Sequence, residues 1–458
     1  MSEETWHAAR LIPTSGIGGA DEQERRATSA LLAVVSAVKE FGRTITAQAG
    51  APAGAIECFV EVPFAVGDRE MVPDGLIRVC RGQRCWTALV EVKTGSNQLQ
   101  REQLESYLDI AREQRFDALL TISNQIPAAP GAHPTEVDRR KLRKVSLHHL
   151  SWTQVLTEAV IQKMHRGVAD PDQAWILGEL IRYLEHPRSG AMEFDDMGGG
   201  WVAVRNAVRT GTLRPTDPAT IEVVSRWDQL IRYACLRLGR QLGTEVQPVL
   251  SRKETANPSL RAQALIEGLV CSGVLEGSAR IPNAVGPVRL SADLRAGQVA
   301  ASITIDAPRD GRPLTRVNWL LRQLKDAPDG LRIDAHALHS HTSTSELLKD
   351  VRAKPTLLIA DPKRELKAFT VTLTRLMGTK RSGGRASFIT SVLDLLDSFY
   401  ESMVQSLRPW SVPAPKLRKP EIEEQEQAPL SSTALSSQDG PEPDHLPLPA
   451  QERAAISG

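Results

Sequence analysis

The sequence predicts an α/β protein in which an N-terminal α/β domain is followed by a helical region and a second α/β or α+β domain. Short β-branched and aromatic runs alternate with amphipathic helical stretches at both ends of the chain, whereas residues from about 148 to 246 keep a helical period throughout. A chain of 458 residues is also too long for one ordinary core.

The first domain is expected over residues 1–147. Apolar residues at helical spacing, closed by Gly42, predict one amphipathic helix over residues 21–42. The elements expected after it are strands at 56–64, 75–80 and 86–93, a helix over 98–115 and a buried strand over 117–123. The predicted order is therefore helix, three strands, helix, strand.

The rest of the chain is expected to form a helical region over residues 148–250 and the second domain over residues 251–410. The second domain should contain a helix ending near Gly277, a hairpin over 288–306, helices over 314–326 and 386–407, and strands at 331–335, 356–360 and 367–373. After Trp410 the chain is rich in Pro, Glu, Gln and Ser, which predicts a disordered tail over residues 411–458.

Composition alone names no function. The hydrophobic content of 41% and charged content of 24% are those of a soluble globular protein, and the formal net charge of +1 means that nucleic acid would have to be attracted by local patches. The N-terminus has no basic start followed by an apolar core, and no run approaches the roughly 18 apolar residues of a membrane span. A cytoplasmic protein without a membrane segment is expected.

Five cysteines without a CxxC pair predict reduced, mostly buried thiols, and argue against a disulfide framework or a zinc site. Cys80 and Cys85 flank a turn and could approach each other.

The stretch MVPDGLIRVCRGQRCWTALVEVKTG, residues 71–95, carries the candidate site. Alternation along a strand puts Glu91 and Lys93 on one face, and a hairpin through RGQRC would bring Asp74 beside Glu91. Two buried carboxylates need a compensating cation, and their oxygens suit Mg²⁺ or Mn²⁺. We therefore predict that Asp74 and Glu91 hold a divalent metal and that Lys93 orients a water or steadies developing negative charge during phosphodiester hydrolysis. A surface ion pair between Glu91 and Lys93 is the simpler alternative.

Pro73, Asp74, Glu91 and Lys93, together with the order of elements around them, resemble the PD-(D/E)XK nuclease superfamily, which implies a restriction-endonuclease-like α-β-β-β-α-β core. The resemblance covers about residues 20–125. Its motif elements also recur singly, as at Glu365 to Lys367, but only around Asp74 do they occur together and in order.

Gln103 and Tyr107 resemble the Q-x-x-x-Y motif of the RecB and lambda exonuclease branch, which implies that they help to hold substrate beside the metal. Many members place a glutamate of the first helix near the metal, and Glu24 is the candidate here, with Glu22 behind it. The cysteines are not placed as in members with an iron–sulfur cluster, so no cluster is expected.

The resemblance implies a Mg²⁺- or Mn²⁺-dependent nuclease that acts on nucleic acid, with DNA as the expected substrate. A role in bacterial defence, repair or stress response follows by analogy only. The alternative is a non-enzymatic nucleic-acid-binding or assembly protein that keeps a nuclease-like scaffold. The C-terminal regions are candidates for contact with a second copy or a partner protein.

Three further stretches carry weaker signals. The basic run at residues 139–144 is either a solvated helix face or a contact for a nucleic-acid backbone. The glycine-rich loop at 378–387 precedes a helix and could bind an anion, although it lacks P-loop spacing. His336, His339 and His341 are expected to form a polar turn more than a metal site.

Overall fold

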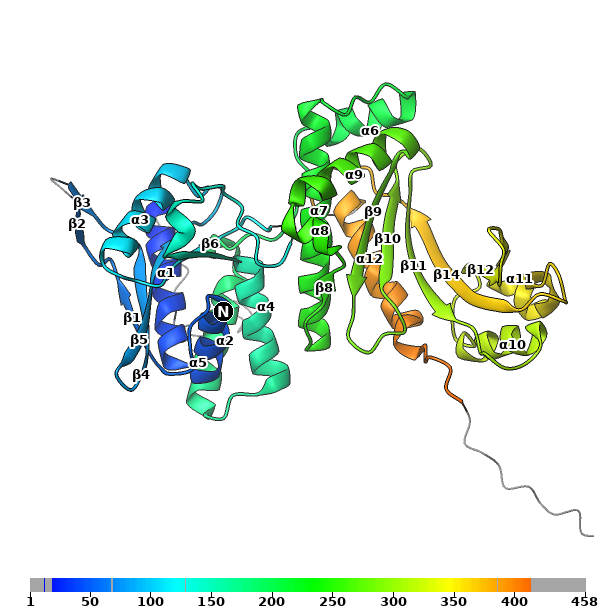
Figure 1. Cartoon of the computed structure of the whole chain (residues 1–458), viewed down its shortest axis with the longest axis horizontal. Helices are drawn as coiled ribbons and strands as arrows, with labels where there is room; N and C mark the ends of the chain where they lie inside the picture. The colour runs from blue at the N-terminus through cyan, green and yellow to red at the C-terminus, as the bar shows by residue number, and fades with distance from the viewer. Residues whose placement is uncertain (1–11, 13–18, 67–68, 128, 385, 413–458) are drawn as a thin grey trace, which may run out of the picture. The chain divides into compact units, whose positions relative to one another are not determined.

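The computed structural model describes residue 12 and residues 19–66, 69–127, 129–384 and 386–412. These residues form a mixed α/β structure with one five-stranded and one seven-stranded sheet, each packed against helices (Figure 1). The predicted disordered tail lies outside the described residues except for its first two positions. No described helix is long and apolar enough to cross a membrane.

The first part of the chain contains the predicted succession of elements, with additions. In order these are α1 (Ala20–Ala37), α2 (Lys39–Gln48), β1 (Ala55–Val60), β2 (Phe64–Val66), β3 (Arg69–Met71), β4 (Gly75–Arg81), β5 (Arg84–Val92), α3 (Arg101–Glu113), β6 (Ala118–Ser123), β7 (Ser146–Ser151), α4 (Trp152–Ile161) and α5 (Pro171–Leu184). The small hairpin of β2 and β3 and the strand β7 were not expected from the sequence.

The prediction of a single helix over residues 21–42 is wrong, because the helical conformation is interrupted at Val38. Val38 is extended and completely buried, and α2 begins directly after it. A Cβ atom at Gly42 would lie only 2.1 Å from the carbonyl oxygen of Val35. Gly42 therefore permits the close packing of α2 on α1. It lies inside α2 and does not end a helix, contrary to the prediction.

The five-stranded sheet has the order β1-β4-β5-β6-β7, antiparallel from β1 to β5 and parallel from β5 to β7. The expectation that residues from 148 onward are helical is therefore wrong for 148–151, which belong to β7. Ser151 ends the strand and also caps α4, since its side chain accepts a hydrogen bond from the amide of Gln154. No glycine or proline separates β7 from α4, so the sequence has no turn signal at this boundary.

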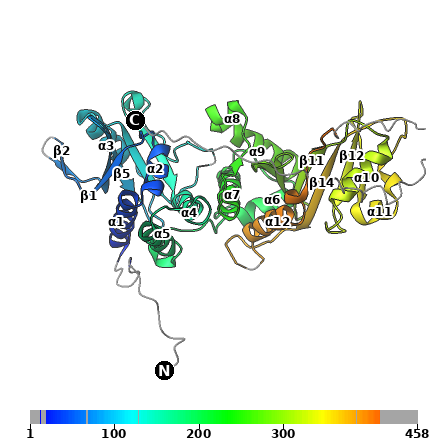
Figure 2. The ribbon, with the colours of Figure 1, turned by 90° about the horizontal axis from the view of Figure 1, so that it is seen from below.

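Helices cover both faces of this sheet. On one face Leu89 and Leu119 pack with Leu104 and Leu108 of α3. On the other face the core contains buried residues of β4, β5 and β6 together with α1, α2, α4 and α5, and Figure 2 shows these helices on the side away from α3. The strand β5 is thus buried on both faces, including the stretch that carries Glu91.

The second part of the chain contains helices before, between and after the strands of the seven-stranded sheet. In order these are α6 (Trp201–Thr210), α7 (Pro218–Leu242), β8 (Gln247–Pro248), α8 (Arg252–Ala256), α9 (Pro258–Ser272), β9 (Val274–Arg280), β10 (Val288–Asp293), β11 (Gln298–Asp306), α10 (Pro313–Gln323), β12 (Arg332–Ala337), β13 (Ser343–Leu347), α11 (Leu348–Ala353), β14 (Leu366–Leu376) and α12 (Phe388–Ser402).

This sheet is antiparallel throughout, in the order β13-β12-β14-β11-β10-β9-β8. Alternate residues of β11, including Val299, Ala301 and Ile303, share a core with Phe388 and Phe399 of α12. Figure 1 shows α12 lying along the strands.

Two details of this second part of the chain differ from expectation. The helix α9 ends at Ser272, because Gly273 adopts a left-handed conformation and β9 follows, so the predicted end near Gly277 is wrong. The strand expected at 356–360 is also wrong, because Pro355–Leu358 form a 3₁₀ turn that starts at a residue without an amide hydrogen. The strands β12 and β14 and the helices α10 and α12 lie where they were predicted.

Candidate active site

The hairpin of β4 and β5 brings Asp74, Glu91 and Lys93 together at one end of the sheet. Gly75 pairs with Val90, so Asp74, one residue earlier, lies opposite the position of Glu91. The Asp74 carboxylate accepts a hydrogen bond of 2.7 Å from the amide of Val92. The Lys93 ammonium lies 2.7 Å from Oε1 of Glu91, so the hairpin gathers two acids and an amine at one place.

Glu24 of α1 is the fourth member of this group. Its Oε1 lies 2.8 Å from Nζ of Lys93, and both side chains are 14% exposed. The approach of α1 depends on Gly75, where a Cβ atom would lie 2.4 Å from a methyl group of Leu32. Glu22, the other candidate, forms an ion pair of 2.8 Å with Arg26 on the same helix.

Burial sets the charge state of the two acids. Glu91 is only 1% exposed; its Oε1 lies against the Lys93 ammonium, and its Oε2 receives no hydrogen bond from a described residue. Burial first, and then the negative charge of Asp74, raise the pKa of Glu91 to about 8. Burial also raises the pKa of Asp74, against the opposing effects of the Val92 hydrogen bond and the Lys93 charge.

Lys93 stays protonated in this setting. Although burial acts to lower it, the charges of Glu91 and Glu24 leave the pKa of Lys93 above its usual value. The alternative of a plain surface ion pair is wrong, because Glu91 is buried and Lys93 touches two acids at once.

The residues present fit a hard divalent cation. The buried Glu91, whose Oε2 has no hydrogen bond from a described residue, and the adjacent half-buried Asp74 offer ligands whose charge a cation would compensate. Within the described part of the chain no group of three or more His, Cys, Asp or Glu side chains is arranged to hold a metal. A metal at this place would therefore take two protein carboxylates and complete its shell with water or substrate oxygens, as Mg²⁺ commonly does.

Gln103 and Tyr107 lie beside the acids, on α3. Nε2 of Gln103 donates to the Tyr107 hydroxyl at 3.2 Å, and this hydroxyl donates to the carbonyl of Val72 at 3.5 Å. Burial, followed by the charge of Glu91, raises the pKa of Tyr107 to about 12, so the ring stays neutral. The pair thus fixes the segment that leads into Asp74.

The loop after β5 carries contacts that no sequence pattern marks. The indole of Trp152 donates to the carbonyl of Lys93 at 2.9 Å, and the amide of Gly95 donates to the carbonyl of Gly190 at 2.9 Å. The side chain of Asn124 donates to both Gly95 and Gly190. These bonds hold the loop in place directly after the candidate lysine.

A polar cavity of about 600 Å³ adjoins this loop. It is lined by Gly19, Ala20, Gln23, Thr94, Gly95, Ser96, Asn97 and Arg188. Asn97 reaches Oε2 of Glu24 at 3.5 Å, so the cavity opens next to the acidic group. Among the described residues of its lining, the cation is Arg188, from a short 3₁₀ turn after α5, and the sequence gives no sign that this residue comes near the hairpin.

The three further stretches contribute less. Residues 139–144 are not a helix face; Lys141 forms an ion pair with Asp109 and the run ends in a 3₁₀ turn with most of its cations exposed. In the glycine-rich loop, the amide of Gly383 donates to Asp195 and that of Phe388 donates to Lys380, so these amides are not free to bind an anion. The polar turn expected for the three histidines is wrong for His336, which lies in β12 and contacts the hydroxyl of Thr370 on β14 at 2.8 Å.

Comparison of the chain with family models, with curated proteins and with solved structures gives no match. What the site can do is therefore inferred from its own chemistry.

Proposed function

We propose that this protein is a Mg²⁺- or Mn²⁺-dependent nuclease of the PD-(D/E)XK type, with a restriction-endonuclease-like core, that hydrolyses phosphodiester bonds of DNA. The observation that carries the proposal is the buried Glu91 carboxylate, which lies beside Asp74 at one end of the sheet, has Oε1 2.7 Å from the Lys93 ammonium and has Oε2 without a hydrogen bond from a described residue. A merely structural ion pair would not bury two acids together at such an electrostatic cost.

Each residue has a distinct role in this proposal. Asp74 and Glu91 would hold the metal, which when bound polarises a phosphate and lowers the pKa of water. Lys93, held protonated by Glu91 and Glu24, places a positive charge where the phosphorane would develop negative charge. Glu24 orients the Lys93 ammonium, and Tyr107 fixes the approach of the chain to Asp74.

The cavity beside Glu24 supports a polyanionic substrate. Its lining offers the guanidinium of Arg188 together with the polar side chains of Ser96 and Asn97, groups that suit a backbone phosphate. A strand that lies in this cavity would pass next to the acids. A cytoplasmic location and a role in bacterial defence, repair or stress response belong to the proposal by analogy.

The test is cleavage of single- and double-stranded DNA and RNA with Mg²⁺ or Mn²⁺. We expect Asp74→Asn and Lys93→Ala each to lower the rate of DNA cleavage by at least about 100-fold, since each removes a group that stabilises the transition state. Glu57→Gln and Lys39→Ala, which change exposed charges on β1 and α2, should cleave like the wild type.

Equal cleavage by the wild type and both site variants would remove the assignment. DNA binding by the wild type without cleavage under any metal condition would instead favour the scaffold alternative, a nucleic-acid-binding protein with an inactive nuclease-like core.

A further inference from the structure

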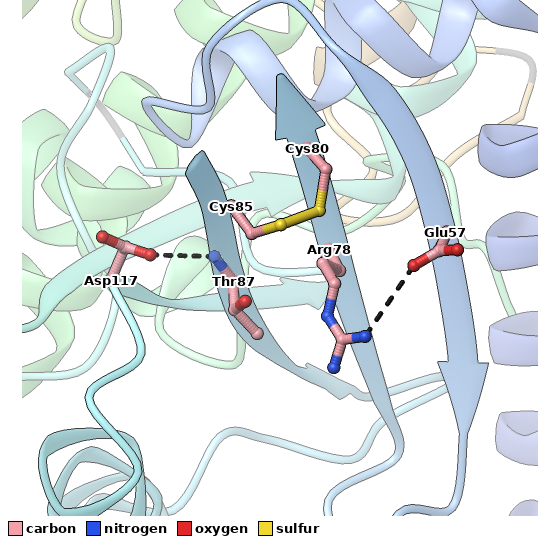
Figure 3. The surroundings of a disulfide bond; sticks show 6 residues. All are labelled: Glu57, Arg78, Cys80, Cys85, Thr87 and Asp117. Carbon is pink, nitrogen blue, oxygen red and sulfur yellow. Dashed lines mark hydrogen bonds and ion pairs between the residues drawn. A yellow bond between two sulfur atoms is a disulfide. The ribbon is translucent and has the colours of Figure 1, made fainter. Parts of the chain in front are cut away.

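The far end of the candidate hairpin carries a disulfide between Cys80 and Cys85. The two cysteines are directly opposite each other in the register of β4 and β5, with a Cα–Cα distance of 4.1 Å (Figure 3). The prediction that these thiols are reduced is therefore wrong. The pairing of β4 with β5 brings the two sulfur atoms together, whereas the spacing of the cysteines in the sequence showed only that such an approach was possible.

The pair is accessible to small molecules. Cys85 is exposed and Cys80 is half-buried, and they lie on either side of the turn at Gly82 and Gln83. The other cysteines differ in kind. Burial raises the pKa of Cys58 and of Cys235 to about 12, and Cys271 is exposed but has no disulfide partner.

The surroundings favour a reactive thiol. Arg81 and Arg84 form the next pair across the turn, so alternation along the strands puts them on the other face from the disulfide. Arg78 lies two residues before Cys80, on the same face of β4, as Figure 3 shows. Positive charge favours the thiolate, which is the form that attacks disulfides.

The hairpin does not depend on the disulfide for its shape. The strand β4 pairs with β1 from Gly75 to Cys80, and β5 pairs with β6 from Ala88 to Val92. Beside the disulfide, the carboxylate of Asp117 accepts a hydrogen bond of 2.8 Å from the amide of Thr87, and Arg78 lies 3.8 Å from Glu57 (Figure 3). Breaking the S–S bond therefore leaves both strands held from their outer sides.

We infer that Cys80 and Cys85 form a reversible thiol–disulfide exchange site whose substrates are low-molecular-weight thiols and disulfides. In the oxidising direction, the thiolate of exposed Cys85 attacks a small disulfide, whose S–S bond breaks and releases one small thiolate. The thiolate of Cys80 then attacks the Cys85 sulfur of the mixed disulfide and releases the second. Two protein thiols and one small disulfide become one protein disulfide and two small thiols, which take up the two protons.

The test uses the full-length protein in buffers of defined ratios of reduced to oxidised glutathione, followed by acid quenching, alkylation and mass spectrometry of the peptides. We expect Cys80 and Cys85 to change together between two alkylated thiols and one disulfide as the ratio changes, with circular dichroism and melting behaviour still those of a folded protein at both ends. Cys58 and Cys235 should stay unmodified in the folded protein, and Cys271 should form only a mixed disulfide.

Single substitutions test the order of attack. Cys80→Ser should trap glutathione on Cys85, whereas Cys85→Ser should leave the half-buried Cys80 modified several-fold more slowly. The inference is overturned if the pair stays reduced in the most oxidising buffer, if its disulfide resists excess glutathione until the protein is unfolded, or if both single variants react at equal rates. None of these readouts depends on nuclease activity.

Discussion

Glu91 is the residue whose environment differs most from that of an ordinary glutamate. In the metal-free protein its pKa is about 8, well above the unfolded value, so the folded state holds a proton that the unfolded state loses. This contribution to stability is fully present below about pH 4.5 and is lost as the pH rises through 8. We expect the free energy of unfolding to fall with a slope of about 1.4 kcal/mol per pH unit between pH 5.5 and 7.5 relative to Glu91→Gln.

Denaturant unfolding in the presence of a chelator measures this difference. If the free energy of unfolding depended on pH in the same way for both proteins, Glu91 would be ionised without cost in the folded state, and the prediction would be wrong.

His149 is a second buried titratable group, and it affects stability at acidic pH. It lies opposite Thr121 in the parallel register of β6 and β7, and Thr121 lies opposite Glu91. Nε2 of His149 lies 2.9 Å from the carbonyl of Gln125 and therefore carries the hydrogen. The hydroxyl of Thr121 then donates to Nδ1 at 2.9 Å and accepts from Nε2 of His133. This arrangement satisfies both neutral rings.

Burial lowers the pKa of His149 to about 4, so its neutral form contributes stability that is present above pH 6.5 and is lost as the pH falls toward 4. We expect the wild type to lose about 2 kcal/mol more than His149→Gln between pH 7 and pH 5. Urea unfolding at several pH values measures this, with His186→Gln, a half-buried histidine outside the Thr121 group, as the control. A wild-type loss no greater than that of His149→Gln would contradict the prediction.

At the scale of elements, the cavity beside the loop after β5 is the expected path of the nucleic-acid strand. Arg188 is the cation in its lining, so Arg188→Ala should weaken binding of single-stranded DNA to the cleavage-deficient Lys93→Ala protein. Losing one phosphate contact should also reduce the slope of log K against log salt concentration by about 0.7. Arg84→Ala removes the same charge at the opposite end of β5 and should leave the slope unchanged. An unchanged slope in Arg188→Ala would show that the strand does not pass through the cavity.

Elements whose signals are local were predictable, and those set by distant contacts were not. The hairpin that unites Asp74 and Glu91 spans fewer than 20 residues, and alternation with a short turn fixes its register. By contrast, no turn signal separates β7 from α4, and β7 forms a strand because it pairs in parallel with β6. The break at Val38 likewise depends on the close approach allowed by Gly42.

The candidate site divides in the same way. Lys93 follows directly from the strand, whereas the contact of Glu24 with Lys93 joins residues 69 positions apart and needs the packing of α1 on β4. Arg188 comes from still farther along the chain, after α5, and no residue pattern there distinguishes it from any exposed arginine. The disulfide required the exact pairing of Cys80 with Cys85, which a count of cysteines does not supply.

At the scale of the whole molecule, a metal that binds the folded state and not the unfolded chain must stabilise the fold. The expected gain is about 2.7 kcal/mol at a Mg²⁺ concentration 100 times the dissociation constant. Because a metal ion would displace the proton that Glu91 holds below about pH 8, its affinity should rise about tenfold per pH unit up to that pH. The rise in melting temperature caused by a fixed concentration of Mg²⁺ should therefore be larger at pH 8 than at pH 6.5. Asp74→Asn and Glu91→Gln should abolish this rise, whereas Glu57→Gln should keep it. A Mg²⁺ effect that is the same in all four proteins would come from ions bound elsewhere and would leave the two carboxylates without a metal.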